Sequence, residues 1–170
     1  MNEITVFRKG QKDEPTMYNV LSELWEREDH VLVFPKLLFS NPYQIVDLFS
    51  FVWRRSGVLR DRIRFHLFQI KFDPFGVDID VLLSHLICTV FQGFQVVVFL
   101  SRATGKETVL TLIVNAVSYY SGIKFHDNNN FYWNLKRELE RLTGCHWYID
   151  SNAIMETGGI GVQNYNNLHG

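Results

Sequence analysis

The stretch from Phe91 to Gly144 decides the fold: it reads FQGFQVVVFLSRATGKETVLTLIVNAVSYYSGIKFHDNNNFYWNLKRELERLTG. Two runs rich in β-branched residues, Gln95–Leu100 and Thr108–Val117, flank the polar loop SRATGKE, and this pattern predicts a β-hairpin. A helix that ends at Gly144 is expected next. The apolar residues that recur at helical spacing are Phe131, Leu135, Leu139 and Leu142.

The residues before this stretch predict further strands and helices. In order, they are a strand at Ile4–Arg8, a helix from Pro15, a short strand or buried extended segment at His30–Phe34, a helix from Asn41-Pro42, a strand at Ile63–Phe72 and a helix from Asp78 or Asp80 to about Phe91. In Ile63–Phe72, alternation places Phe68, Ile70 and Phe72 on one face, and Phe65, Leu67, Gln69 and Lys71 on the other.

With a short final strand, the order β-α-β-α-β-α-β-β-α-β favours an α+β fold. Its central sheet should be mainly antiparallel, with helices packed on it. Residues 1–150 are predicted to form a single domain, and the Gly- and Asn-rich residues 151–170 a flexible C-terminal tail.

Composition limits the possible classes of function. The chain has 170 residues, of which 46% are hydrophobic and 15% aromatic, so a folded core is expected. A formal net charge of −1 provides no overall positive field for nucleic acid. Two cysteines are too few for a disulfide framework, and Cys88 is expected to be buried in an apolar helix. No apolar run approaches a membrane span, and the polar N-terminus does not resemble a secretory signal, so we expect a soluble cytoplasmic protein.

Four segments resemble the relaxases, or mobilisation nucleases, of the HUH endonuclease family. RFHLFQIKFDP resembles the family's YHLVISFxP strand, and GFQVVVFLS its GYQVVVATH strand. LIVNAVSYYSGIKFHDNN resembles its HIVINSVNxxTGKKFHxNK segment, and FYWNLKRELERLTG the helix that follows. The resemblance covers about Ile63 to Tyr148 and implies a HUH relaxase-like fold, in a protein of a mobile genetic element that takes part in conjugation or plasmid mobilisation.

The resemblance also implies a lost activity. Relaxases nick DNA with a tyrosine on the first helix and a metal held by histidines. Here the HxHxH positions are Glu107, Val109 and Thr111, which share a strand face with Asn115. A further family histidine falls on Ser101, the family's serine on Lys71, and the tyrosine near Leu24. Valine cannot bind a metal, and one carboxylate rarely makes a site. We therefore expect a pseudoenzyme without catalytic residues, metal or cofactor.

The first functional hypothesis is a catalytically inactive relaxase-like protein that binds DNA or docks on the DNA-transfer machinery. Its DNA would be single-stranded or hairpin, and the oligomeric state is left open. The candidate phosphate-contacting residues are Lys71, Arg102, Lys106 and Lys124, with Asn115 and Asn128 as hydrogen-bonding companions. The run RRSGVLRDRIR is the densest basic stretch and could follow a DNA backbone, although a solvated face is the favoured explanation.

Two alternatives belong to other classes. The first is a protein-binding regulator or inhibitor that uses the relaxase fold without contacting DNA. Near-neutral charge favours it, and so would exposure of Tyr119-Tyr120 and Phe131-Tyr132-Trp133, for which core packing is the simpler expectation. The second is an active enzyme that combines Tyr18 with Glu107 and an unidentified metal ligand.

Overall fold

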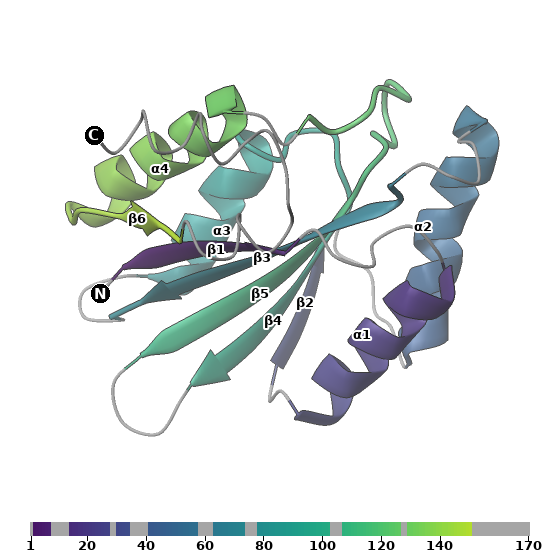
Figure 1. Cartoon of the computed structure of the whole chain (residues 1–170), viewed down its shortest axis with the longest axis horizontal. Coiled ribbons are helices and arrows are strands. Elements are labelled where there is room, and N and C mark those ends of the chain that lie inside the picture. The colour runs from purple at the N-terminus through teal and green to yellow at the C-terminus, as the bar shows by residue number, and fades with distance from the viewer. Residues whose placement is uncertain are drawn as a thin grey trace.

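The structure is a computed structural model that describes residues 2–7, 14–27, 30–34, 41–57, 63–73, 78–102, 107–126 and 129–150 (Figure 1). The predicted tail, residues 151–170, lies outside the described residues. The elements are β1 (Glu3–Phe7), α1 (Glu14–Arg27), β2 (His30–Phe34), α2 (Pro42–Ser56), β3 (Phe65–Phe72), α3 (Ile79–Cys88), β4 (Val96–Arg102), β5 (Thr108–Asn115), α4 (Asn129–Thr143) and β6 (Tyr148–Ile149). This order confirms the predicted one.

The described strands form one sheet in the order β2-β4-β5-β3-β1-β6. All neighbouring strands are antiparallel except β1 and β6, which are parallel. The prediction of an α+β fold with a mainly antiparallel sheet is therefore confirmed. Strands β4 and β5 form the expected hairpin, in which Val98 lies opposite Leu112.

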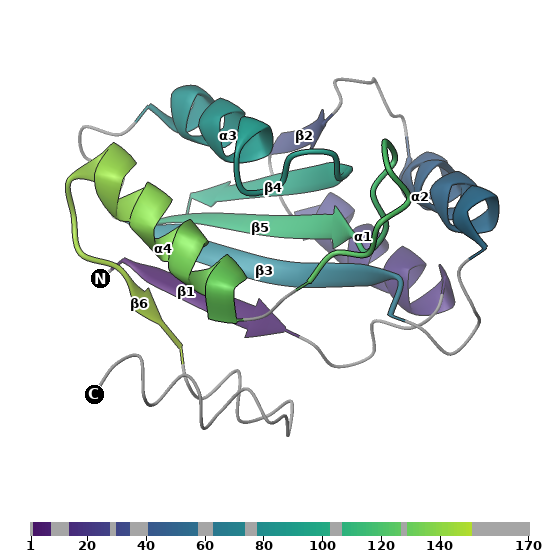
Figure 2. The same cartoon turned by 90° about the horizontal axis from the view of Figure 1, so that it is seen from above.

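Helices cover both faces of the sheet, with α3 and α4 on one side and α1 and α2 on the other (Figures 1 and 2). The face under α3 and α4 carries a wide apolar core in which Phe68 is completely buried. The ring of Phe68 lies 5.5 Å from that of Phe131 and 6.2 Å from that of Phe91. The second core, under α1 and α2, is smaller and includes Phe49 and Ile113.

Local sequence signals set the ends of α2. The side chain of Asn41 accepts a hydrogen bond from the Gln44 N–H, and Pro42 occupies the first turn. Gly57 ends the helix in the left-handed conformation, with φ of 68°, which a residue with a Cβ rarely adopts. The N-cap signature predicted at Asn41-Pro42 is confirmed.

Several expected element bounds and one expected burial need adjustment; for example, β5 ends at Asn115, two residues before the predicted Val117. Helix α3 begins after its N-cap Asp78 and ends at Cys88, three residues before Phe91. Cys88 is exposed, so its predicted burial is wrong: it falls on the outer face of α3, whereas Leu82 and Leu86 point to the core. Strand β3 begins at Phe65, two residues later than predicted. In the part of the chain that the structure describes, no helix has the length and hydropathy to cross a membrane.

Candidate functional site

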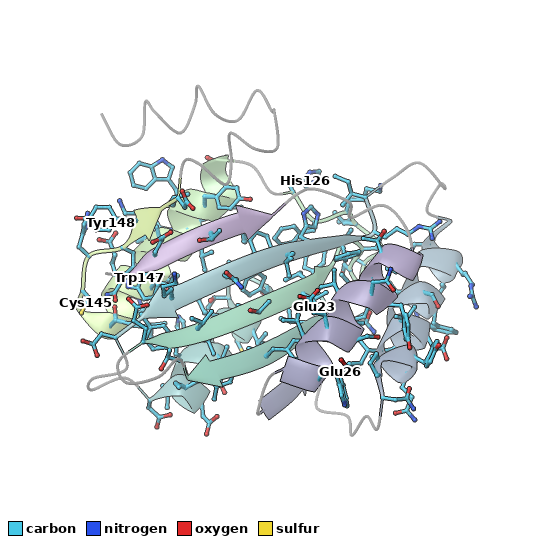
Figure 3. All side chains as sticks on the ribbon, turned by 60° about the horizontal axis from the view of Figure 1, so that its bottom comes forward. Glu23, Glu26, His126, Cys145, Trp147 and Tyr148 are labelled. Atoms are coloured by element: carbon cyan, nitrogen blue, oxygen red, sulfur yellow. The ribbon has the colours of Figure 1, made fainter. Side chains whose placement is uncertain are left out.

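The sheet face that carries α1 and α2 changes from polar to apolar along its length. In register across the sheet, Glu3, Lys71 and Val109 make the row farthest from α2, and Thr5, Gln69 and Thr111 make the next. Closer to α2 the rows become apolar, because Leu67 lies opposite Ile113. Helix α1 crosses only the apolar end of this face, and no described helix covers the polar end (Figure 3). We call this polar end, made of Glu3, Thr5, Gln69, Lys71 and Val109, the open sheet face.

The open sheet face is where the relaxase resemblance places the metal ligands. Val109 and Thr111 are on β5, and Glu107 immediately precedes that strand. The side chain of Gln69 donates a hydrogen bond to Thr111 Oγ1 over 3.3 Å. Thr111 itself is only 3% exposed. These groups form a polar patch that can offer hydrogen bonds but contains no imidazole.

Charge on the open sheet face is mixed. Lys71 lies directly opposite Glu3 on the neighbouring strand, so a carboxylate and an ammonium group share one row. Opposite charges in such cross-strand pairs offset each other locally. A DNA backbone needs several unopposed cations along its path. Counting only its described residues, the face that Lys71 was predicted to make basic is therefore close to neutral.

Asn115 does not belong to an accessible surface, so its predicted phosphate contact is wrong. The residue is completely buried beneath α2. Its Oδ1 accepts hydrogen bonds from the indole of Trp53 (2.7 Å) and the Val117 N–H (3.1 Å). Its amide donates to Gln95 Oε1 over 2.7 Å and more weakly to the Phe49 carbonyl over 3.4 Å. The side chain connects α2, the residue before β4 and the residues after β5, and these four bonds use its hydrogen-bonding capacity.

Of the other predicted phosphate contacts, the two with described side chains, Lys71 and Lys124, lie on separate parts of the fold. Lys124 forms an isolated bridge with Val117, whereas Lys71 pairs with Val109. The eight positions between Val109 and Val117 correspond to roughly 26 Å of extended chain. Lys106 and Asn128 lie outside the described residues, as does the side chain of Arg102.

The tyrosine proposed for the active-enzyme alternative lies between the two helices of the smaller core. The ring of Tyr18 stacks on that of Tyr43, with 4.2 Å between centroids. The hydroxyl of Tyr43 donates to that of Tyr18, which lowers the pKa of Tyr18 and raises that of Tyr43. Leu24, where the resemblance places the nucleophile, is 4% exposed and packs in the smaller core.

Three of the described histidines, His66, His85 and His146, have contacts with neighbouring side chains. His66 is 4% exposed and its ring packs 4.9 Å from that of Phe125. His85 contacts Glu138, and His146 contacts Glu140. Across the described ranges, no three His, Cys, Asp or Glu side chains come together as metal ligands could.

A second surface contains aromatic residues that the sequence analysis expected to be buried. Tyr119 and Tyr120 are 38% and 87% exposed, so the expected core packing is wrong for this pair. The same expectation is confirmed for Phe131 and Tyr132, which are buried, and fails again for Trp133, which is 42% exposed. We call the residues Phe51, Arg55, Tyr119, Tyr120 and Ile123 the Tyr120 surface.

Comparison with known proteins gives no match: no family model, no curated protein and no solved structure resembles this chain significantly.

Proposed function

We propose that this chain is a catalytically inactive, cytoplasmic protein with a HUH relaxase-like fold, belonging to a mobile genetic element, and that it acts by docking on a protein of the DNA-transfer machinery. The relaxase part of the proposal rests on the four resembling segments. The docking part rests on the surface properties of the folded chain. Of the two modes considered from the sequence, protein contact is favoured over DNA contact.

One observation carries the proposal. The open sheet face is not covered by a described helix, and its described side chains cannot supply what phosphodiester cleavage requires. Val109 and Thr111 occupy the positions where the family has metal-binding histidines, and Lys71 is opposed by Glu3. A phosphodiester cleavage needs a metal or several cations to stabilise the charge that develops on the phosphate. Neither is provided by the described residues of this face.

The lack of metal ligands among the described residues argues against nicking, and the pairing of Lys71 with Glu3 argues against tight DNA binding at this face. The burial of Asn115 removes a further predicted phosphate contact. The exposed aromatic residues Tyr119 and Tyr120 instead favour a binding role, since tyrosine and arginine are enriched at the energetically important positions of protein interfaces.

A test of the catalytic part uses the purified chain with single-stranded and hairpin oligonucleotides in the presence of Mn²⁺ or Mg²⁺. We expect neither cleavage nor a covalent protein–DNA adduct. An adduct that Tyr18→Phe abolishes would instead support the active-enzyme alternative.

A test of the docking part uses the same oligonucleotides in a gel-shift series at low salt, together with affinity purification from the native host after nuclease treatment. We expect no shift and a protein partner that resists the nuclease. A shift that weakens steeply with salt would favour the DNA-binding mode, because released counterions make that binding salt-dependent. Absence of any nuclease-resistant partner would refute docking.

A further inference from the structure

The Tyr120 surface exposes several large apolar side chains. Tyr120 is 87% exposed, and Phe51 and Ile123 are each 61% exposed. Arg55 links the two sides of the surface, because its guanidinium lies 5.9 Å from the Phe51 ring and also donates to the Tyr119 carbonyl. Exposed apolar clusters of this kind mark interaction sites more often than single exposed residues do.

The loop that presents Tyr120 is held rigidly. Ser118 is 3% exposed, and its hydroxyl accepts from the N–H groups of Tyr120 (3.2 Å) and Ser121 (3.1 Å) while it donates to the Gly93 carbonyl (2.8 Å). The Ser118 N–H bonds to the Ile123 carbonyl over 2.9 Å and closes the loop. A loop fixed in this way loses little conformational entropy when a partner binds.

The loop stands beside the C-terminal end of α2, as Figure 2 shows. One hollow of about 420 Å³ lies between the loop and residues 92–94, and another of about 530 Å³ lies between the loop and Arg55-Ser56. Both hollows are lined by Tyr119, Tyr120 and Ser121. A partner side chain placed beside Tyr120 can therefore enter a recess on either side of the loop.

Charge indicates what kind of segment fits. Among the described residues that line the two hollows, Arg55 is charged and none carries a carboxylate. Arg54, its neighbour on α2, is exposed. A carboxylate on the partner would therefore meet a cation without a competing anion, and a large apolar side chain would meet the tyrosines.

The position at a helix C-terminus argues against nucleic acid. The C-terminal end of α2 carries a partial negative charge, which Arg54 and Arg55 in the last turn offset. Arg55 also donates a hydrogen bond to the Tyr119 carbonyl, so part of its hydrogen-bonding capacity is already used. A chain of phosphates needs several cations in sequence, whereas a single carboxylate needs one.

We propose that the Tyr120 surface binds a segment of a partner protein in which a large apolar side chain stands next to an aspartate or glutamate. This inference rests on the proposed function, because it assigns the docking site and the chemistry of its partner.

The inference is tested with the full chain as bait in a selection from a displayed library of random linear peptides. We expect enrichment of Asp or Glu next to Leu, Ile or Phe. The binding of a selected peptide, followed by fluorescence anisotropy, should weaken about tenfold or more in Tyr120→Ala, as removal of a central aromatic contact does. Tyr148→Ala, which changes a tyrosine 47% exposed on β6, is the matched control and should bind normally.

Thermal denaturation of both variants shows whether each is folded, and Ile123→Ser provides a second change on the same surface. Selected peptides that bind Tyr120→Ala and Ile123→Ser as well as they bind the wild type would overturn the inference. It would also fail if no peptide were enriched, or if a short oligothymidine bound in a Tyr120-dependent manner and displaced the peptides.

Purification of nuclease-resistant partners with the wild-type chain and with Tyr120→Ala separates this inference from the proposed function. Retention of the same partner by both would overturn the Tyr120 site and leave docking intact. The site is supported if the wild-type chain retains a partner that Tyr120→Ala loses, and if the selected peptide displaces that partner from the wild-type chain. Absence of a partner with the wild-type chain would refute docking in the host, and the peptide measurements would then decide the site by themselves.

Discussion

The indole Nε1 of Trp53 donates a hydrogen bond to Oδ1 of Asn115 over 2.7 Å, although the two residues are 62 positions apart. The same indole N–H lies 3.0 Å from the Arg64 carbonyl. Helix α2 is thereby attached to the end of β5 and to the residue that precedes β3. The resemblance to relaxases predicted that Asn115 lies on an accessible strand face, but the side chain belongs to the core.

The first prediction concerns this buried amide. Asn115→Ala should lower the free energy of unfolding by about 2–4 kcal/mol, because it leaves the polar groups of Gln95 and Val117 without a partner inside the protein. Urea denaturation measures the change. Asn134→Ala removes an exposed bond to Arg137 and should change stability by less than about 0.5 kcal/mol. A similarly small loss for Asn115→Ala would contradict the structural role.

The second prediction uses the geometry of the open sheet face. Lys71 and Val109 lie opposite each other on β3 and β5, and side chains in such pairs are about 5 Å apart at Cβ. The double variant Lys71→His and Val109→His should therefore bind Ni²⁺ or Zn²⁺, which favour imidazole ligands. At a free metal-ion concentration one hundred times Kd, binding would raise the free energy of unfolding by about 2.7 kcal/mol. A thermal-shift titration measures this, with each single variant as a control.

Equal responses of the single and double variants would contradict the cross-strand register. On the relaxase hypothesis, metal binding alone would still not give nicking, because Leu24, at the position that the resemblance assigns to the tyrosine, is buried.

The third prediction concerns pH. Arg141 and His85 hydrogen-bond to Glu138 and hold the pKa of its carboxyl below the usual range. A depressed pKa stabilises the folded state at neutral pH, and this contribution is lost as the pH falls through the folded-state pKa. Stability should therefore decline more between neutral pH and about pH 3 in the wild type than in Glu138→Gln.

A double-mutant cycle with Arg141→Met isolates the Glu138–Arg141 pair. The coupling between the two changes should be measurable at neutral pH and vanish in acid. The same coupling at both pH values would show that Glu138 is not the titrating group. Because Arg141 is 57% exposed, the coupling should also weaken with added salt.

The fourth prediction concerns the two thiols. Cys88 and Cys145 are both exposed, so both should react with a chromogenic disulfide reagent in the native protein. In the native protein, both thiols should react with the reagent at rates close to those measured in concentrated urea. Cys88→Ser and Cys145→Ser assign the signal, and one thiol that reacts only after unfolding would show that the corresponding residue is covered in solution.

The order of strands and helices could be predicted from the sequence because its signals are local. Alternation in Phe65–Phe72, the proline after Asn41 and the glycine after Thr143 each act within a few residues. The faces of β3 were predicted correctly for the same reason, since successive side chains of a strand point to opposite sides. Cys88 was assigned incorrectly because a short apolar helix gives little indication of which side meets the core.

The candidate site depended on contacts that no local pattern encodes. Lys71 looks like a free cation in the sequence, and only the pairing of β1 with β3 places Glu3 opposite it. Tyr119-Tyr120 and Phe131-Tyr132 are similar aromatic pairs, yet one is exposed on a loop and the other is buried under a helix.

By itself, the sequence determined the elements and their order, because residue identity and short-range periodicity are sufficient for these. Only the tertiary structure decided that Asn115 is part of the core, that the open sheet face is nearly neutral and that Tyr120 is accessible. The physical reason is that burial and local charge depend on which distant segments meet, and those meetings are set by the packing of the whole chain.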